Sequence, residues 1–304
     1  MGQGGEPVDG NERLDGGLEA FLQLGARSVA IPPPVPPGGS CKDPVIVLTY
    51  AHSGHELLRT MLEGHPHLMC VPDAGIVPLC RHAMETWRQV ERCPGGRPSA
   101  LALAAVRSMV GALITPLLAR DGKPRWCDIS PGSALAAPAF LALFPGTQFI
   151  CLHRNCLDVV SAVLKSSPWG VMEGGLRRFT VAHPGNHAAA IANYWVIHTK
   201  AMTDFQEEYA GRCITVRYED LCADPEQVRK EVFAFLGEDI CPCRDGGPGS
   251  GDVPHRAGGS APRAGDSGMP GGMVPAALIP PHVLAEVNDS LARLGYPVIP
   301  YGKQ

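Results

Sequence analysis

A short polar loop, residues 51–56, gathers most of the side chains that could do chemistry in this 304-residue chain. It reads Ala-His-Ser-Gly-His-Glu, and lies between the apolar run 45–49 and a stretch beginning near Glu56 whose apolar residues have helical spacing. A strand, a tight turn with glycine and a helix N-terminus direct backbone N–H groups and the positive helix end at an anion. The loop therefore predicts an anion site, although an ordinary strand-to-helix turn would show the same pattern.

Three continuous apolar runs rich in β-branched residues are the expected strands of the domain that positions this loop. They cover residues 45–49, 148–152 and 213–218. Runs without polar alternation are typical of strands covered on both faces. With helical patterns between them, they predict the α/β class, namely a three-layer α/β/α domain with a mainly parallel central sheet. The expected helices are 57–63, 157–165, 188–209 and 225–236.

Proline and glycine mark the expected domain boundaries. Residues 1–41 end in a proline-rich spacer and are expected to be a disordered segment, so that the globular domain covers 42–304. A second Gly/Pro-rich stretch at 244–272 has few apolar residues and is expected to form a long loop. Helical spacing returns at 283–291.

Composition favours a cytoplasmic protein. The formal net charge of −4 gives no field that would attract nucleic acid or an anionic membrane, so neither is expected as a partner. Eleven cysteines without a regular framework suit a reducing compartment, and the polar N-terminus does not resemble a signal peptide. The apolar stretch 101–119 contains Arg107 and Pro116, which favours a buried or amphipathic helix. Oligomeric state is left open.

Four segments, in order along the chain, carry a resemblance to a known family. The loop and the following helix are similar to a Pro-Arg-Ser-Gly-Thr-Thr-Leu-Leu-Arg motif with a His-Pro end, and Trp-Cys-Asp-Ile-Ser-Pro is similar to Trp-x-Asp-Lys-x-Pro. In combination they resemble the sulfotransferases that use 3'-phosphoadenosine-5'-phosphosulfate (PAPS), particularly bacterial ones and the tyrosylprotein sulfotransferases. The segments are residues 51–66, 126–131, 143–161 and 216–225, the last running into 233–237.

The resemblance implies a P-loop-like sulfotransferase fold, PAPS as sulfuryl donor and the bisphosphate PAP as product. It places Arg154 on the 3'-phosphate, through the planar fork of the guanidinium, and Tyr218 near the adenine. The family serine that binds the 3'-phosphate corresponds to Ala162, so Ser161 is the candidate instead, about 100° away on a helix. The implied nucleotide-binding residues are His52, Ser53, Gly54, His55, Glu56, Leu57, Arg154, Ser161 and Tyr218.

The loop departs from the family at chemically important positions. His52 replaces a Lys or Arg, His55 and Glu56 replace threonines, and Ile129 replaces a frequent Lys. Histidine carries a charge only when protonated, with an unperturbed pKa of ~6.5, and a bound bisphosphate would favour that form. We therefore expect His52 to serve as the cation, while Glu56 points away from the donor or caps the helix.

Two residues are candidates for the base that deprotonates the acceptor. Asp73 follows the His-Pro pair at the place where related enzymes have a catalytic Glu, although an Asp in such a loop is also a common turn former. His55 is the competing candidate, and geometry must decide between them.

The resemblance predicts transfer of a sulfuryl group from PAPS to a hydroxyl, phenol or amine of a small-molecule acceptor, in bacterial specialised metabolism. A second hypothesis is a repurposed fold that uses His52, His55 and Glu56 for PAPS-independent acid–base or metal chemistry. A third is a non-catalytic nucleotide-binding protein. His65 and His67 could add metal ligands, but they lie a helix length from the loop, so no metal site is assigned.

Overall fold

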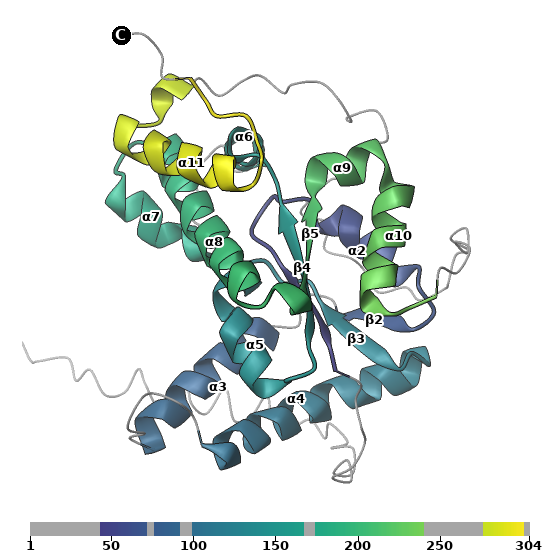
Figure 1. Cartoon of the computed structure of the whole chain (residues 1–304). Coiled ribbons are helices and arrows are strands. Elements are labelled where there is room, and N and C mark those ends of the chain that lie inside the picture. The colour runs from purple at the N-terminus through teal and green to yellow at the C-terminus, as the bar shows by residue number, and fades with distance from the viewer. Residues whose placement is uncertain (1–42, 72–75, 92–98, 167–173, 240–275, 301–304) are drawn as a thin grey trace, which may run out of the picture. The chain divides into compact units, whose positions relative to one another are not determined.

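Five parallel strands form the central sheet of the computed structural model, in the order β2-β3-β1-β4-β5 (Figure 1). The structure describes residues 43–71, 76–91, 99–166, 174–239 and 276–300, all within one unit that spans 40–304. The strands are β1 (Val45–Leu48), β2 (Leu68–Val71), β3 (Arg125–Asp128), β4 (Gln148–His153) and β5 (Cys213–Arg217).

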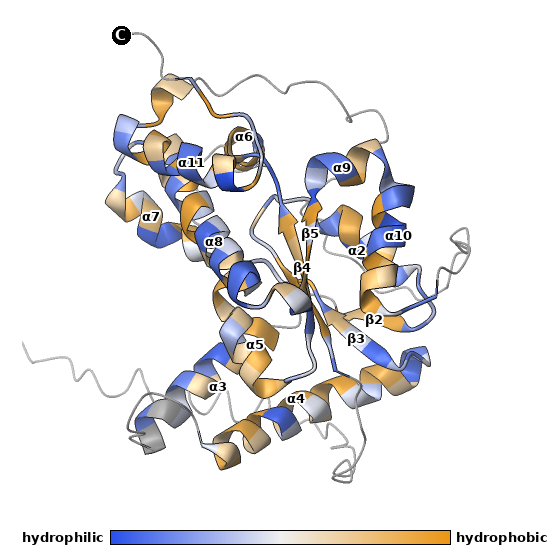
Figure 2. Cartoon of the chain, in the orientation of Figure 1, coloured by the Kyte–Doolittle hydropathy of each residue, from blue (hydrophilic) through white to orange (hydrophobic). Residues whose placement is uncertain are grey.

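Strand β1 lies at the centre of the sheet, where Val45 is in register with Cys127 of β3 and Gln148 of β4. All four of its side chains are fully buried, and Figure 2 shows the central strands as mostly hydrophobic. Ile46 and Leu48 belong to the apolar cluster on one face of the sheet, and the alternate residues of β1 to the cluster on the other. This period of two is what a strand covered on both faces requires.

Helices cover both faces, which confirms the predicted three-layer α/β/α architecture (Figure 1). One layer consists of α2 (His55–Glu63), α9 (Tyr218–Ala223) and α10 (Pro225–Leu236). The opposite layer contains α3 (Ile76–Glu91), α4 (Ala100–Asp121), α5 (Ala137–Leu143), α6 (Cys156–Ser166), α7 (Arg177–Ala182), α8 (His187–Glu208) and α11 (Pro281–Arg293).

The three predicted strands are confirmed to within one residue at each end. Tyr218, expected to end a strand, is the first residue of α9. Helix α2 begins at His55, one residue before the expected start, because Gly54 forms its N-terminal cap. The sequence does not predict β2 and β3, since β2 has a single β-branched residue and β3 begins and ends with a charged side chain.

The apolar stretch at 101–119 forms most of α4, as expected of a helix. By length and composition α4 could cross a membrane. In the structure one of its faces is buried against neighbouring elements, through Ala102, Val106, Val110, Ile114 and Leu118. Three earlier expectations lie outside the described residues, namely the segment 1–41, the loop 244–272 and the position of Asp73.

Candidate nucleotide-binding site

The loop between β1 and α2 has the backbone of an anion cradle. Its turn is closed by the N–H of Ser53, which donates to the carbonyl of Tyr50 at 3.3 Å. Gly54 has φ 96° and His52 has φ 61°, both in the left-handed region. The N–H groups of Leu57 and Leu58 return to the carbonyl of Gly54 at 3.1 and 3.4 Å. The N–H groups of a helix's first turn point away from the helix, toward its N-terminal end. They and the helix dipole favour an anion at this end of α2.

Gly54 is required by a close approach as well as by its backbone angle. A Cβ atom at this position would lie 2.1 Å from Cδ2 of Tyr218, well inside contact distance. The first residue of α9 therefore packs directly on the loop. Partial burial raises the pKa of Tyr218.

Arg154, which directly follows β4, joins the two other parts of the site. Its Nη1 donates to the main-chain carbonyl of His52 at 2.9 Å, and its Cζ lies 4.1 Å from the centroid of the Tyr218 ring. Its Nε is buried without a hydrogen-bond partner among the described residues. A buried guanidinium N–H without an acceptor, beside a helix N-terminus, suits an anionic ligand.

The two histidines and the carboxylate of the loop have different neighbours. His52 Nε2 lies 3.2 Å from the hydroxyl of Ser166, at the end of α6. His55 Nε2 lies 3.6 Å from a carboxylate oxygen of Glu56, whose second oxygen accepts from Arg59 Nε at 2.9 Å. Glu56 thus lies on the exposed surface of α2, where it pairs with Arg59.

The remaining candidates vary in burial. Leu57 is 37% exposed at the start of α2, and Ser161 is 8% exposed on α6. Ile129 is 5% exposed and packs in the same apolar cluster as Leu58, so a core side chain takes the place of the family lysine. Asp73 lies outside the described residues, and the structure therefore does not decide between it and His55.

Side chains distant in sequence hold this site together. The hydroxyl of Ser133 donates to the carbonyl of Val47 at 2.7 Å and accepts from the N–H of Thr49 at 3.0 Å. Glu219 accepts from the N–H of Asn155 at 2.9 Å and from the hydroxyl of Tyr296 at 2.6 Å. Glu219 therefore orients the loop after β4. No local sequence signal marks either set of contacts.

His65, His67 and Glu238 form a separate group whose possible ligand atoms all lie within 4.8 Å of one another. They lie where β2 begins, whereas the loop follows the end of β1, so the parallel sheet separates them from His52 and His55. Both ring nitrogens of His65 are engaged, Nδ1 by the N–H of His67 and Nε2 by the carbonyl of Asp239. Coordination shared between the two groups of histidines does not occur in this fold.

A parallel α/β sheet with a helix N-terminus and an arginine beside one loop is an arrangement that suits an anionic ligand. A sequence model described as the sulfotransferase family matches residues 44–242, and the chain belongs to that family.

Similar proteins agree with this assignment. A putative protein-tyrosine sulfotransferase of Caenorhabditis briggsae is 26% identical over 187 residues, covering 60% of this chain and 61% of the relative. The protein-tyrosine sulfotransferase of Drosophila melanogaster is 23% identical over 189 residues, or 60% of this chain and 36% of the relative. The match thus spans less than two thirds of the length of these relatives.

Solved structures show the same fold. The sulfotransferase domain from the curacin biosynthetic pathway superposes with a TM-score of 0.55 at 18% identity, covering 84% of this chain and 98% of that one. The sulfotransferase domain of the olefin synthase from Synechococcus PCC 7002 gives 0.51 at 21% identity, covering 87% and 98%.

Proposed function

We propose that this chain binds PAPS and transfers its sulfuryl group to an acceptor oxygen. The observation that carries the proposal is the pairing of a helix N-terminus at Gly54 with the buried, unsatisfied Nε of Arg154. The loop and the arginine come from adjacent strands, β1 and β4, and meet through the His52 carbonyl. Two anion-binding groups in contact suit a ligand that carries negative charge at both ends.

Each part of the site has a proposed task. The amides at the start of α2 would hold the 5'-phosphosulfate, Arg154 with Ser161 the 3'-phosphate, and Tyr218 the adenine. PAPS supplies an activated sulfuryl group and a bisphosphate leaving group. Because charge develops on the leaving oxygen, a nearby cation should contribute most to the rate. His52 would be that cation when protonated, with its Nε2 beside the Ser166 hydroxyl.

The proposed base is His55 or Asp73. The carboxylate of Glu56, 3.6 Å from His55 Nε2, would stabilise the imidazolium that forms when His55 takes the acceptor proton. We propose a phenol as the acceptor, since relatives of this chain are named protein-tyrosine sulfotransferases and a small phenol offers the same nucleophile. Free phenols and tyrosine-containing peptides are therefore the substrates to compare.

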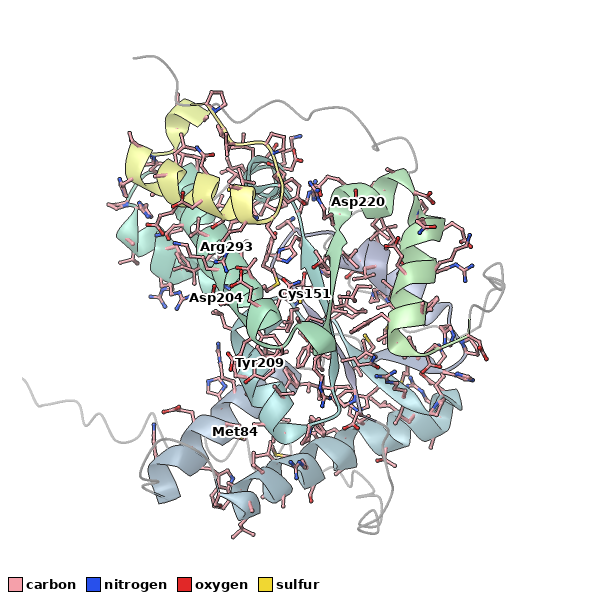
Figure 3. All side chains as sticks on the ribbon, in the orientation of Figure 1. Met84, Cys151, Asp204, Tyr209, Asp220 and Arg293 are labelled. Carbon is pink, nitrogen blue, oxygen red and sulfur yellow. The ribbon has the colours of Figure 1, made fainter. Side chains whose placement is uncertain are left out.

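Calorimetric titration with PAP tests the nucleotide site. Wild-type protein should bind PAP, and Arg154→Ala should weaken binding by at least about tenfold, since hydrogen bonds to a charged group contribute about 1.5–3 kcal/mol each. Arg293→Ala is the matched control, because this arginine bonds Asp204 and Glu207 on the surface of α8 (Figure 3). Equal PAP affinity of wild type and Arg154→Ala, or no PAP binding at all, would overturn the assignment.

Product analysis by mass spectrometry tests the transfer itself. With PAPS and a phenol, the protein should release PAP and an acceptor heavier by one sulfuryl group. PAP binding without turnover on any phenol, hydroxyl or amine would support the non-catalytic alternative. Turnover of an acceptor in the absence of PAPS would instead support repurposed chemistry at the loop histidines.

A further inference from the structure

Tyr50, the residue between Thr49 and the loop, has a hydroxyl whose hydrogen-bonding capacity is fully used. The side chain is completely buried. Its hydroxyl donates to the carbonyl of Arg154 at 3.1 Å and accepts from the N–H of Arg154 and from Trp195 Nε1, both at 3.0 Å. One donated and two accepted bonds are what a phenolic hydroxyl can make. Burial raises the pKa of Tyr50, which keeps its proton in place.

Arg154 is held at both ends by this arrangement. Tyr50 engages both polar groups of its main chain, and Trp195 Nε1 also reaches its carbonyl at 2.9 Å. The guanidinium is held separately, by the His52 carbonyl and the Tyr218 ring. The start of the Arg154 side chain is therefore fixed by contacts that do not involve the ligand-binding atoms.

The main chain of Tyr50 also forms part of the turn that begins the loop between β1 and α2. Its carbonyl accepts the Ser53 N–H that closes the turn. The next amide, that of Ala51, donates to the hydroxyl of Tyr194 at 3.2 Å. Tyr194 and Trp195 are consecutive residues of α8, so this helix contacts both the loop and the Arg154 segment.

We propose that Tyr50 is a positioning residue that sets the distance between the cradle at the start of α2 and Arg154, with Trp195 of α8 as its support. The inference deepens the proposed function and rests on it, because both groups are proposed to bind one nucleotide. Tyr50 itself is covered by protein and would touch no ligand. Its hydroxyl acts through Arg154, which predicts a defined pattern of coupling between the two residues.

The test is a double-mutant cycle on PAP affinity with Tyr50→Phe, Arg154→Ala and the double variant. Tyr50→Phe keeps the ring and removes the hydroxyl, leaving the buried N–H of Arg154 without its acceptor. We expect the dissociation constant of PAP to rise about tenfold in Tyr50→Phe. The double variant should bind no more weakly than Arg154→Ala, because the hydroxyl has no route to the ligand once the guanidinium is gone.

The matched control is Thr203→Ala, which removes another buried hydroxyl of the fold. Within the part of the chain that the structure describes, this hydroxyl bonds only carbonyls of its own helix, those of Thr199 and Lys200, and it lies outside the proposed site. The control should lose stability without weakening PAP binding. Unchanged affinity in Tyr50→Phe, additive losses in the cycle, or an equal loss in the control would each overturn the proposal.

Amide hydrogen exchange separates failure of this inference from failure of the proposed function. In Tyr50→Phe the amide of Arg154 should exchange faster than in wild type, and in Thr203→Ala it should not. That result depends on the hydrogen bonds and not on any nucleotide. If the Arg154 amide exchanges faster in Tyr50→Phe but the wild-type protein does not bind PAP, the Tyr50 network is retained and nucleotide binding is rejected. Unchanged exchange in Tyr50→Phe would reject the network.

Discussion

At the scale of single residues, the site depends on a few positions where the backbone itself is specialised. His52 and Gly54 both have positive φ, within three residues, and the Arg154 guanidinium bonds the carbonyl of the first. Such backbone is uncommon for a residue with a side chain and concentrates at functional sites. The Ser-Gly pair of the loop sequence predicted the turn, but not the tyrosine that lies against it.

Gly54→Ala should be more damaging than the same change at another left-handed glycine. Gly122 has φ 64° and ends α4 with open space around it, so Gly122→Ala measures the backbone cost alone, about 1 kcal/mol. At Gly54 the new methyl group also meets Tyr218 at 2.1 Å. We expect urea denaturation to show a loss larger by about 1–3 kcal/mol than at Gly122, as for an overpacked site.

PAP binding should also weaken in Gly54→Ala and stay unchanged in Gly122→Ala. Equal losses of stability in the two variants would mean that the tyrosine ring can move away at no cost. The close packing of Tyr218 on the loop would then not be a requirement of the fold.

At the scale of secondary-structure elements, the sequence predicted best what repeats locally. The runs of β1, β4 and β5 are continuous and β-branched, and the helices between them have regular apolar spacing, so both were recognisable. The Trp-Cys-Asp segment was read as a motif and not as β3, because four residues with charged ends show no strand pattern. Contacts such as Tyr50 with Trp195 join residues 145 positions apart, and no local pattern encodes them.

Arg125, the first residue of β3, joins several elements at the amino-terminal ends of the parallel strands, opposite the end at which the loop 51–56 lies. It is buried and donates to the carbonyl of Asp43 at 2.9 Å and to the side chain of Gln148 at 2.7 Å. Its Nη1 also lies 3.5 Å from Glu238 Oε1. It thus links the chain before β1, the start of β4 and the end of α10.

Arg125→Ala should destabilise the fold by about 3 kcal/mol, because it leaves the carbonyls of Asp43 and Leu236 without this donor and removes one of the partners of the buried Glu238 carboxylate. Arg125→Lys keeps the charge but not the planar fork of the guanidinium. Its free energy of unfolding should therefore lie between those of the wild type and Arg125→Ala. Urea denaturation gives the stability, and titration with PAP should show unchanged affinity in the folded fraction. Weaker PAP binding in the folded fraction would show that the amino-terminal end of the sheet is not independent of the loop 51–56.

At the scale of the whole molecule, burial of histidines in the core makes stability depend on pH. His153 and His198 are both almost fully buried, and burial lowers the pKa of each to about 4. His153 adjoins Arg154, and the ring of His198 lies 4.2 Å from that of Tyr194. Both histidines therefore lie on elements next to the loop, His153 at the end of β4 and His198 on α8.

The sign follows from where protons bind. An unfolded histidine takes up a proton near pH ~6.5, whereas these two stay neutral in the folded chain until about pH 4. Between those values the unfolded state binds more protons than the folded state. The stability that depends on these neutral histidines is therefore fully present above pH ~6.5 and is lost as the pH drops toward 4. Each histidine should contribute a slope of up to about 1.4 kcal/mol per pH unit in that window.

His198→Leu should therefore flatten the dependence of the unfolding free energy on pH. Urea denaturation from pH 8 to pH 4.5 should show a slope smaller by about 1.4 kcal/mol per pH unit in the variant at the acidic end of the window. Above pH 7 the two curves should run parallel, and their separation there measures only the change in packing. Curves that stay parallel down to pH 4.5 would show that His198 takes up its proton equally in the folded and unfolded chains, and that its burial does not set the acid sensitivity of the layer that holds the loop.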